Sequence, residues 1–461
     1  MGNKSKTIFI CTQCAYESVK WEGKCPSCNS WNTFQEHQKV KQGSTNTARD
    51  SIIGGKPNSR KAKRAVRIDE VETGQTIRYE CADDELNRVL GGGIVAGSVI
   101  LVGGQPGVGK STLLLQLALQ NNYKLLYVSG EESEEQIKLR ADRVGTKNDN
   151  CFLYTNINTE EIIKEARKLE PQILIIDSIQ TLSSPLVDSI PGSISQIREC
   201  AYELQRFAKA SGVTVFIIGH ITKDGNIAGP KILEHIVDTV LQFEGDANYS
   251  YRVLRTTKNR FGSTDEIGIY EMVERGLKTV ENPSELFLRQ GDHKLSGSAI
   301  AATLEGLRPM LIEVQALVSS AVYGTPQRSS TGFDLRRLSM LLAVLEKRGG
   351  FAFGHNDIFL NIAGGIKVND PSIDLSIIAA LLSSLEDSPI EDGVCFAGEI
   401  GLSGEVRSVN RLEQRIQEAD RLGFKTMYVS KFNLKGLDPK RYELEIVPIG
   451  KVEELYQYLF V

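Results

Sequence analysis

The chain has 461 residues, 41% of them hydrophobic and 24% charged, which is typical of a soluble globular protein of roughly two to four domains. Its formal net charge of −4 excludes a basic nucleic-acid coat protein, so any nucleic-acid site must be a local patch. The absence of an apolar run that could cross a bilayer, and of a signal peptide, predicts a cytoplasmic protein without a membrane partner. The eight cysteines of such a protein do not indicate disulfides.

Two Cys-x-x-Cys pairs lie near the N-terminus, ten residues apart. Two such pairs can place four thiolates tetrahedrally around one Zn²⁺, and four thiolates leave no open position for catalysis. A redox-active Cys-x-x-Cys motif is the alternative, but two copies in one short module favour zinc. We therefore predict a structural zinc finger over residues 1–35, with the ligands Cys11, Cys14, Cys25 and Cys28.

Three aromatic residues accompany these cysteines: Trp21, Trp31 and Phe34. A core of this size buries too little apolar surface to stabilise a fold by itself. We expect the three rings to pack together in a small core that is stable only with the metal bound.

Residues 36–67 are rich in serine, threonine, asparagine, glycine and basic residues and contain few large apolar ones. This composition predicts a basic, flexible linker. The basic run from Arg60 to Arg64 has two interpretations: a solvated tether, or an arm that contacts nucleic-acid phosphates.

Residues 103–112 read Gly-Gly-Gln-Pro-Gly-Val-Gly-Lys-Ser-Thr and match the phosphate-loop pattern G-x-x-x-x-G-K-[ST]. Residues 98–102 are expected to form a buried strand, and residues 111–119 a helix whose N-terminus faces the phosphates. In this pattern Lys110 contacts the β- and γ-phosphates of a nucleotide, and the Ser111 hydroxyl contacts Mg²⁺. The predicted nucleotide-binding residues are Gly104, Gln105, Pro106, Gly107, Val108, Gly109, Lys110, Ser111 and Thr112.

Strand patterns alternate with helical ones from residue 68 to residue 285, which predicts an α/β domain built on a parallel, doubly wound sheet. Ligands of such sheets bind at the carboxyl ends of the strands. The strands expected after the phosphate loop span residues 124–129, 151–154, 172–178, 212–219, 237–244, 251–257 and 267–272.

Polar residues at three of these strand ends are expected to complete a hydrolytic site. Asp177 ends a buried strand and would help to hold Mg²⁺ through water. Either Glu131 or Glu132 would polarise the attacking water, and the sequence leaves open which of them does so. His220 either senses the γ-phosphate or is simply hydrogen-bonded.

Four basic residues are candidates for contacts with other molecules. Lys223 and Lys231 lie in a glycine-containing loop at the same sheet edge and are candidate DNA contacts, with ordinary surface charge as the alternative. Lys258 and Arg260 flank a short turn, which is either salt-bridged or inserted as cationic fingers into the nucleotide site of a neighbouring subunit. We also regard these two residues as candidate DNA contacts.

The order of the motifs along the chain carries a family resemblance. The four cysteines come first, then Leu90-Gly-Gly-Gly93, the phosphate loop, Gly130-Glu-Glu132 and Lys258-Asn-Arg-Phe-Gly262. In this order they resemble the bacterial RadA/Sms family of RecA-like DNA repair proteins, over essentially the whole chain.

The resemblance implies a RecA-like ATPase domain over residues 68–285, with ATP and Mg²⁺ as its cofactors. It maps Glu131 onto the catalytic glutamate, and Lys258 and Arg260 onto a motif needed for motor function. It further implies a hexameric ring that binds single-stranded and branched DNA and drives branch migration during recombination with RecA.

Residues 286–461 resemble the proteolytic domain of Lon proteases, with Ser372 in the nucleophile motif Asp370-Pro-Ser372. The lysine that should activate this serine maps onto Glu413, and a carboxylate cannot replace the amine of a Ser–Lys dyad. We therefore expect an α/β Lon-protease-like scaffold for ring assembly and DNA contact, without proteolytic activity.

The function expected from these features is that of a DNA-dependent ATPase and branch-migration helicase. Two alternatives remain. One is a non-motor mediator that uses ATP to load or stabilise RecA on DNA. The other is an ATP-dependent protease, which the residue at position 413 disfavours.

Overall fold

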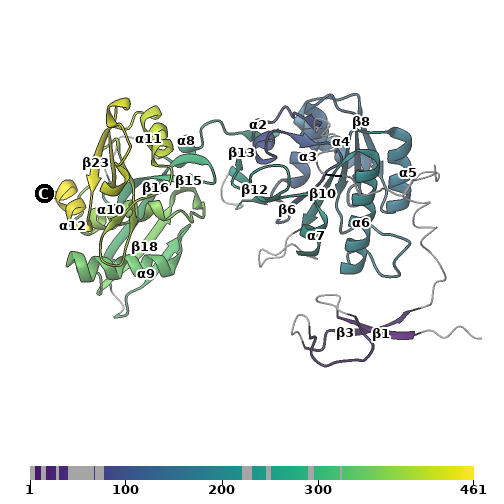
Figure 1. The fold of residues 1–461 in the computed structure, drawn as a ribbon, viewed down its shortest axis with the longest axis horizontal. Coiled ribbons are helices and arrows are strands. Elements are labelled where there is room, and N and C mark those ends of the chain that lie inside the picture. The colour runs from purple at the N-terminus through teal and green to yellow at the C-terminus, as the bar shows by residue number, and fades with distance from the viewer. Residues whose placement is uncertain are drawn as a thin grey trace, which may run out of the picture. The chain divides into compact units, whose positions relative to one another are not determined.

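The computed structural model describes residues 6–11, 17–26, 31–39, 67, 77–220, 231–245, 251–288, 295–321 and 324–461 (Figure 1). The chain divides into two compact units. The first comprises Met1–Gly245, Ser250–Thr264 and Tyr270–Thr279, and the second Asp246–Tyr249, Asp265–Ile269 and Val280–Val461. None of the described helices combines the length and apolarity that a membrane span requires.

The N-terminal module is a three-stranded antiparallel sheet with β1 (Lys6–Cys11) between β2 (Glu17–Ser18) and β3 (Phe34–Lys39). β3 pairs with β1 along its whole length, so the strand extends past residue 35, where we placed the end of the zinc finger. Of the predicted linker, only residues 36–39 and Arg67 are described, and the basic run after residue 59 lies outside the described residues.

The core of this module differs from the prediction. Cys11, Cys25 and Phe34 are buried together. Trp21 and Trp31, by contrast, have 55% and 70% of their surface exposed, so the expectation that they form the core is wrong. The two buried cysteines and one phenylalanine already occupy the interior, which leaves both indoles on the surface.

A nine-stranded sheet organises the rest of the first unit, in the order β14-β13-β12-β11-β6-β10-β9-β7-β8. The six strands from β11 to β8 in this order are parallel, which confirms the predicted doubly wound α/β fold. β12 runs antiparallel to β11, and β14 antiparallel to β13. The strands are β6 (Val99–Gly104), β7 (Leu125–Ser129), β8 (Cys151–Thr155), β9 (Ile173–Asp177), β10 (Thr214–His220), β11 (Thr239–Glu244), β12 (Tyr251–Asn259), β13 (Ile267–Val273) and β14 (Gly276–Thr279).

Successive residues of a strand point to opposite sides of the sheet. Both faces therefore carry apolar side chains, and helices cover both of them. Val99 and Leu101 of β6 belong to one buried cluster, and Ile100 and Val102 to the other. The first cluster includes side chains of α5 (Thr159–Leu169), α6 (Ile194–Ser211) and α7 (Lys231–Ile236). The second includes side chains of α2 (Asp84–Val89), α3 (Lys110–Gln120) and α4 (Glu134–Val144).

The second unit is built on a seven-stranded mixed sheet in the order β17-β18-β16-β15-β19-β22-β23. The almost fully buried α10 (Asp374–Leu385) and the amphipathic α11 (Leu412–Arg421) both pack against β15 and β16. The strands are β15 (Ser298–Glu305), β16 (Arg308–Ser320), β17 (Arg328–Thr331), β18 (Asn356–Ile362), β19 (Val394–Ala397), β22 (Thr426–Ser430) and β23 (Glu445–Ile449). The remaining α-helices are α8 (Pro283–Phe287), α9 (Leu335–Val344) and α12 (Val452–Phe460), and β20 (Glu399–Ile400) pairs with β21 (Val406–Arg407).

Candidate functional site

The phosphate loop connects β6, which lies inside the sheet, to the N-terminus of α3. Two of its glycines are required by geometry. A side-chain carbon on Gly104 would lie 2.6 Å from the carbonyl oxygen of Phe243, and Gly109 has a φ of +113°. Either position would be strained with any other residue, so the loop backbone can approach a phosphate closely only with glycine there.

Lys110 is the cation of this loop and is almost fully buried. Its Nζ donates hydrogen bonds to the carbonyl oxygens of Gly104 at 2.8 Å and Gln105 at 2.9 Å. Burial lowers the pKa of Lys110 to about 8, although the charges of Asp177 and Glu131 act in the opposite direction. The structure thus brings Lys110 together with both predicted carboxylates.

Asp177 is the last residue of β9 and is held by a tyrosine that the sequence analysis did not single out. The Tyr127 hydroxyl, from the neighbouring strand β7, donates a 2.6 Å hydrogen bond to Asp177 Oδ2. Both side chains are buried, and burial raises the pKa of Tyr127 well above its usual value, so its hydroxyl keeps its proton. A tyrosine within an otherwise apolar strand indicates a buried polar partner, because the hydroxyl of a buried tyrosine usually forms a hydrogen bond.

The two adjacent glutamates have different surroundings. Ser178 Oγ donates a 2.5 Å hydrogen bond to Glu131 Oε1, and His220 Nε2 lies 3.3 Å from the same oxygen. Glu132 instead forms an ion pair with Arg140 of α4. Only Glu131 is therefore linked to the ends of β9 and β10.

The ionisation of Glu131 follows from these contacts. Burial raises its pKa, but the hydrogen bonds from Ser178 and His220, together with the charge of Lys110, bring the pKa below its ordinary value. Its side chain is still 41% exposed. Glu131 is thus an ionised carboxylate that remains accessible to a ligand.

Lys258 and Arg260 lie at the opposite end of the strands from the phosphate loop. Arg260 Nη1 is 3.1 Å from Oδ1 of the buried Asp238, whose backbone N–H donates to the carbonyl of Val99, the first residue of β6. The phosphate loop begins at the last residue of β6, Gly104, roughly 16 Å further along the strand. The chain therefore does not bring these two cations to its own nucleotide site.

The side chain of Lys258 is fixed at the end of a helix. Its Nζ donates to the carbonyl oxygens of Glu234 and Val237, the second at 2.9 Å, where α7 ends. Burial, and then the charge of Arg260, lower its pKa. The alternative of a salt-bridged turn describes the Arg260–Asp238 pair, while Lys258 caps a helix C-terminus.

Two other members of the Lys258–Gly262 motif have a packing role that the sequence analysis missed. Asn259 Nδ2 donates to the carbonyl of Leu90 at 3.3 Å. A side-chain carbon on Gly91 would lie only 3.1 Å from the Cα of Gly262. Arg78 joins the two segments, since its guanidinium donates to the carbonyls of Gly91 at 2.9 Å and Phe261 at 2.7 Å. The Leu90–Gly93 turn and this motif are thus one structural element.

Two further predicted sites fall partly outside the described residues. Lys223 lies outside them, and Lys231 begins α7 with its side chain outside them. Cys14 and Cys28 also lie outside, while Cys11 and Cys25 are buried on the interior of the N-terminal module, as zinc-binding thiols would be. Among the described residues, no group of three or more cysteine, histidine or carboxylate side chains is placed to hold a metal ion.

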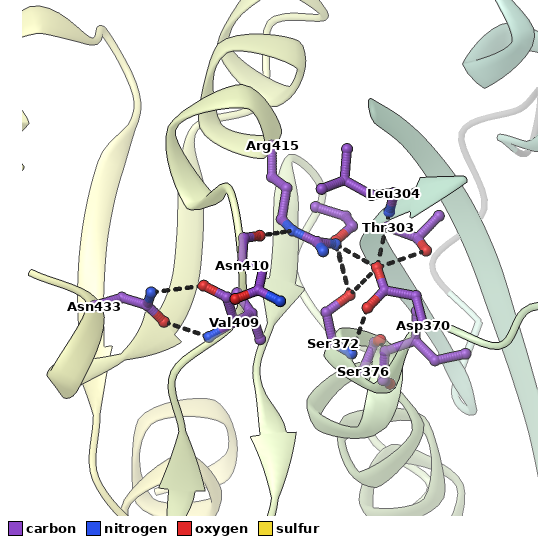
Figure 2. Close-up of polar contacts among 11 residues, drawn as sticks. Thr303, Leu304, Asp370, Ser372, Ser376, Val409, Asn410, Arg415 and Asn433 are labelled. Atoms are coloured by element: carbon purple, nitrogen blue, oxygen red, sulfur yellow. Dashed lines mark hydrogen bonds and ion pairs between the residues drawn. The ribbon is translucent and has the colours of Figure 1, made fainter. Parts of the chain in front are cut away.

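The serine of the second unit has an unexpected partner (Figure 2). Arg415 Nη1 lies 2.6 Å from Ser372 Oγ and 2.7 Å from Asp370 Oδ2, and it also donates to the carbonyl of Ala302 at 2.8 Å. Glu413 is exposed on the solvent side of α11. The prediction that Glu413 stands where the activating lysine would be is therefore wrong: the residue that faces the serine is Arg415.

The phase of α11 explains this correction. Its buried residues are Leu412, Arg415, Ile416 and Ala419, the spacing of one helix face. Position 413 lies on the other face, whatever residue occupies it. A guanidinium remains protonated in proteins, so Arg415 cannot accept the proton of Ser372.

Three family profiles match the chain. The profile described as "AAA domain" matches residues 63–226, "Rubredoxin metal binding domain" residues 9–36, and "Subunit ChlI of Mg-chelatase" residues 317–433. Together they bear out an ATPase core between an N-terminal zinc ribbon and a Lon-like C-terminal domain.

Curated proteins match along nearly the whole length. The "DNA repair protein RadA" of Bacillus subtilis is 46% identical over 454 residues, which cover 98% of each chain. That of Halalkalibacterium halodurans is 48% identical over 456 residues, again 98% of each chain. A KaiC-like protein of Pyrococcus horikoshii aligns in structure with 44% of this chain and 99% of its own, at 18% identity and a TM-score of 0.38.

Proposed function

The chain belongs to the RadA family of DNA repair proteins, and from this membership we propose that it is an ATP-driven motor on single-stranded DNA. Family and AAA domain together make it a DNA repair ATPase. The finer proposal is that hydrolysis drives branch migration of recombination intermediates, in cooperation with RecA. The observation that carries it is the position of His220, which contacts Glu131 and directly precedes the segment that contains Lys223.

The residues around the phosphate loop fit Mg²⁺-ATP. A carboxylate from Asp177 and a hydroxyl from Ser111 are hard oxygen ligands of the kind that Mg²⁺ prefers, and Tyr127 fixes the carboxylate. When bound, Mg²⁺ would offset the negative charge that develops on the phosphates. Lys110 would exchange its two carbonyl partners for the β- and γ-phosphates, whose charge favours its protonated form.

Glu131 is the residue that we propose to orient and deprotonate the attacking water. It is ionised, accessible and held by two side chains, whereas Glu132 is occupied by Arg140. Ser178 and His220 would act as positioning residues, because their hydrogen bonds fix one oxygen of Glu131 and leave the second for water.

A ring of subunits would give Lys258 and Arg260 their role. Both lie far from the phosphate loop of their own chain, so a contact with ATP would have to be made across a subunit boundary. Such a cation, supplied by a neighbour, stabilises the charge on the transferred phosphoryl group. We propose a hexamer with nucleotide sites between subunits, which would couple hydrolysis at one site to movement of the next subunit.

The surroundings of Ser372 disfavour the protease alternative. Its hydroxyl is bound to a permanently charged guanidinium, and it is fully buried. We propose that the Lon-like unit serves in assembly and DNA contact. A peptidase assay would overturn this if cleavage occurred and disappeared in Ser372→Ala.

The experiment that tests the motor is ATP turnover with and without single-stranded DNA, beside the variant Lys110→Ala. We expect DNA to raise turnover and the variant to have none. Strand displacement without RecA then separates a motor from a mediator, because only a motor unwinds DNA alone. Turnover that ignores DNA, or displacement that requires RecA, would favour the mediator.

A further inference from the structure

Two exposed tryptophans lie beside one glycine in the N-terminal module. The exposed fractions are 55% for Trp21 and 70% for Trp31. A side-chain carbon placed on Gly23 would lie 3.9 Å from the Trp21 ring and 4.0 Å from the Trp31 ring. Both rings therefore come within 4.0 Å of one point, and their nearest atoms are at most twice that distance apart. Two clustered, exposed indoles mark a surface with a binding role.

The backbone beneath the rings is held in place. Lys24 and Trp31 form an antiparallel bridge, and the Asn32 N–H donates to the carbonyl of Gly23 at 2.8 Å. Cys25, which follows Lys24 in the chain, is fully buried. The indoles thus stand on a paired backbone anchored to the interior of the module.

The charges around the rings indicate the chemistry of the partner. Lys24 Nζ lies 5.7 Å from the centre of the Trp31 ring, and Lys20 is exposed nearby in sequence. The carboxylate between them, Glu22, already accepts a 3.1 Å hydrogen bond from Ser18. In a chain with a net charge of −4, cations beside bare aromatic rings favour a polyanion that carries flat apolar groups.

We propose that Trp21, Trp31 and Lys24 form a base-stacking platform for single-stranded DNA. Bases repeat at about 3.4 Å along a stacked strand. The nearest atoms of the two rings are at most about 8 Å apart, so both rings can engage bases of the same short stretch of one strand. Lys24 and Lys20 then lie beside the phosphates. The proposal rests on the proposed function only for the choice of DNA, and it adds a DNA contact outside the ATPase unit's own loops.

The chain carries its own reporter for this platform, since Trp21 and Trp31 are its only two tryptophans. Full-length, zinc-loaded protein is titrated with end-labelled oligothymidylate in the absence of nucleotide. The anisotropy of the label measures binding, and tryptophan emission measures contact with the platform. We expect emission to be quenched in step with the rise in anisotropy, and a duplex to quench far less because its bases are already stacked.

Two outcomes of this titration would overturn the proposal. One is a rise in anisotropy with unchanged tryptophan emission, which would show that the strand binds elsewhere. The other is emission that ignores the oligonucleotide but shifts when purified RecA is added, which would assign the face to a protein partner.

Variants test the same point without fluorescence. Trp31→Ala should weaken oligothymidylate binding roughly tenfold, and Trp31→Phe should retain most of the affinity. Gly23→Val keeps both indoles but places methyl groups between them, and should weaken binding as well. The matched control is Leu139→Ala on α4, which removes an apolar side chain that is 67% exposed and should change nothing.

Zinc content shows whether each variant module is folded. If Trp31→Ala and Gly23→Val retain zinc and still bind the strand as tightly as the parent protein, the platform does not exist. The result is also separable from the motor. If DNA quenches tryptophan emission but does not stimulate ATP turnover, the platform is supported and the motor is contradicted. If DNA stimulates turnover without quenching the emission, the motor is supported and the platform is contradicted.

Discussion

The nucleotide site and the Ser372 site use the same kinds of group, a cation, a carboxylate and a hydroxyl, but arrange them in opposite ways. In the ATPase unit, the partners of Lys110 among the described residues are two backbone carbonyls, and Glu131 remains 41% exposed. In the Lon-like unit, Arg415 is 2% exposed and is bound to Ser372, Asp370 and backbone oxygens. One set of groups is open to a ligand, and the other is closed upon itself.

The difference shows what converts a catalytic arrangement into a structural one. Lysine can lose a proton when buried, and the pKa of Lys110 is lowered to about 8. Arginine cannot, so Arg415 acts only as a donor. Burial raises the pKa of Asp370, but the charge and hydrogen bond of Arg415 lower it below the ordinary value, so the pair is ionic. We expect the open site to govern activity and the closed site to govern stability.

The largest effect on ATP turnover should come from replacing Glu131, and its neighbour Glu132 provides the comparison. Glu131→Gln removes the base but keeps the shape, and should reduce ATP turnover about 10²- to 10⁴-fold while nucleotide binding persists. Glu132→Gln is the matched control and should stay within a few-fold of the parent, because its carboxylate faces Arg140. Single-turnover hydrolysis measures both. Equal losses in the two variants would contradict the assignment of Glu131.

The closed site should respond in stability. Arg415→Ala leaves Asp370, whose side chain is only 13% exposed, without its counter-ion, which should cost about 3–5 kcal/mol in the free energy of unfolding of this unit. Calorimetry of the full chain can follow the transition, with Glu413→Ala on the exposed side of the same helix as the control. A variant Arg415→Ala that melts like the parent would show that the ion pair is not structural.

The same ion pair predicts a pH dependence of stability. Because the pKa of Asp370 is lower in the folded chain than in the unfolded one, its contribution is present above the unfolded value and disappears as the pH falls through the folded value. The parent should therefore lose stability in acid more steeply than Arg415→Ala. Parallel acid-unfolding curves for the two proteins would argue against this coupling.

A smaller effect should follow from Tyr127→Phe, which deletes only the hydroxyl that holds Asp177. A lost hydrogen bond to a charged group is worth roughly tenfold, and we expect the Mg²⁺ concentration needed for half-maximal turnover to rise by about that factor. The control is Tyr154→Phe on the neighbouring strand, whose hydroxyl faces Asn156. If only the maximal rate fell, without a change in Mg²⁺ requirement, the positioning role would be wrong.

The mildest change should be the pH dependence of nucleotide binding. Phosphates bind the protonated form of Lys110, whose pKa in the free protein is about 8. Affinity should therefore be nearly constant from about pH 7, above which the terminal phosphate is ionised, to about pH 8, and fall by up to about tenfold per pH unit above that. Glu131→Gln removes a charge that raises this pKa, so its decline should begin at lower pH. The measurement is the affinity for Mg²⁺-free nucleotide at several pH values on both sides of pH 8. An affinity that does not change across pH 8 would show that Lys110 is not involved.

The strand, loop and helix around the predicted nucleotide site could be predicted because this arrangement is local in sequence. The phosphate loop, the strand before it and the helix after it are contiguous, and Asp177 ends an apolar run that can only be a buried strand. The residue pattern alone did not distinguish Glu131 from Glu132, and only the family resemblance favoured Glu131, because adjacent residues after a strand are distinguished by partners from other elements, here Ser178 and Arg140.

The incorrect predictions also concern residues whose positions depend on packing between distant parts of the chain. Arg415 is not apparent from the sequence because it lies only two positions after Glu413, and only the packed phase of α11 decides which of them faces Ser372. The sequence predicts that Trp21 and Trp31 lie in a core because apolar residues usually do, but Cys11, Cys25 and Phe34 fill the small interior. The distance of Arg260 from the phosphate loop depended on the pairing of β11 with β6.

The contact between Gly91 and Gly262 has a consequence for how this protein can evolve. A side-chain carbon on either glycine would lie 3.1 Å from the Cα of the other, so neither can gain a side chain unless the other segment shifts. Their codons are therefore tied to each other across most of the gene for the ATPase unit. A drifting lineage should therefore keep both glycines unless the two segments move apart together, and a chimera that takes its N-terminal half from a distant relative should be rescued by exchanging the Lys258–Gly262 segment as well.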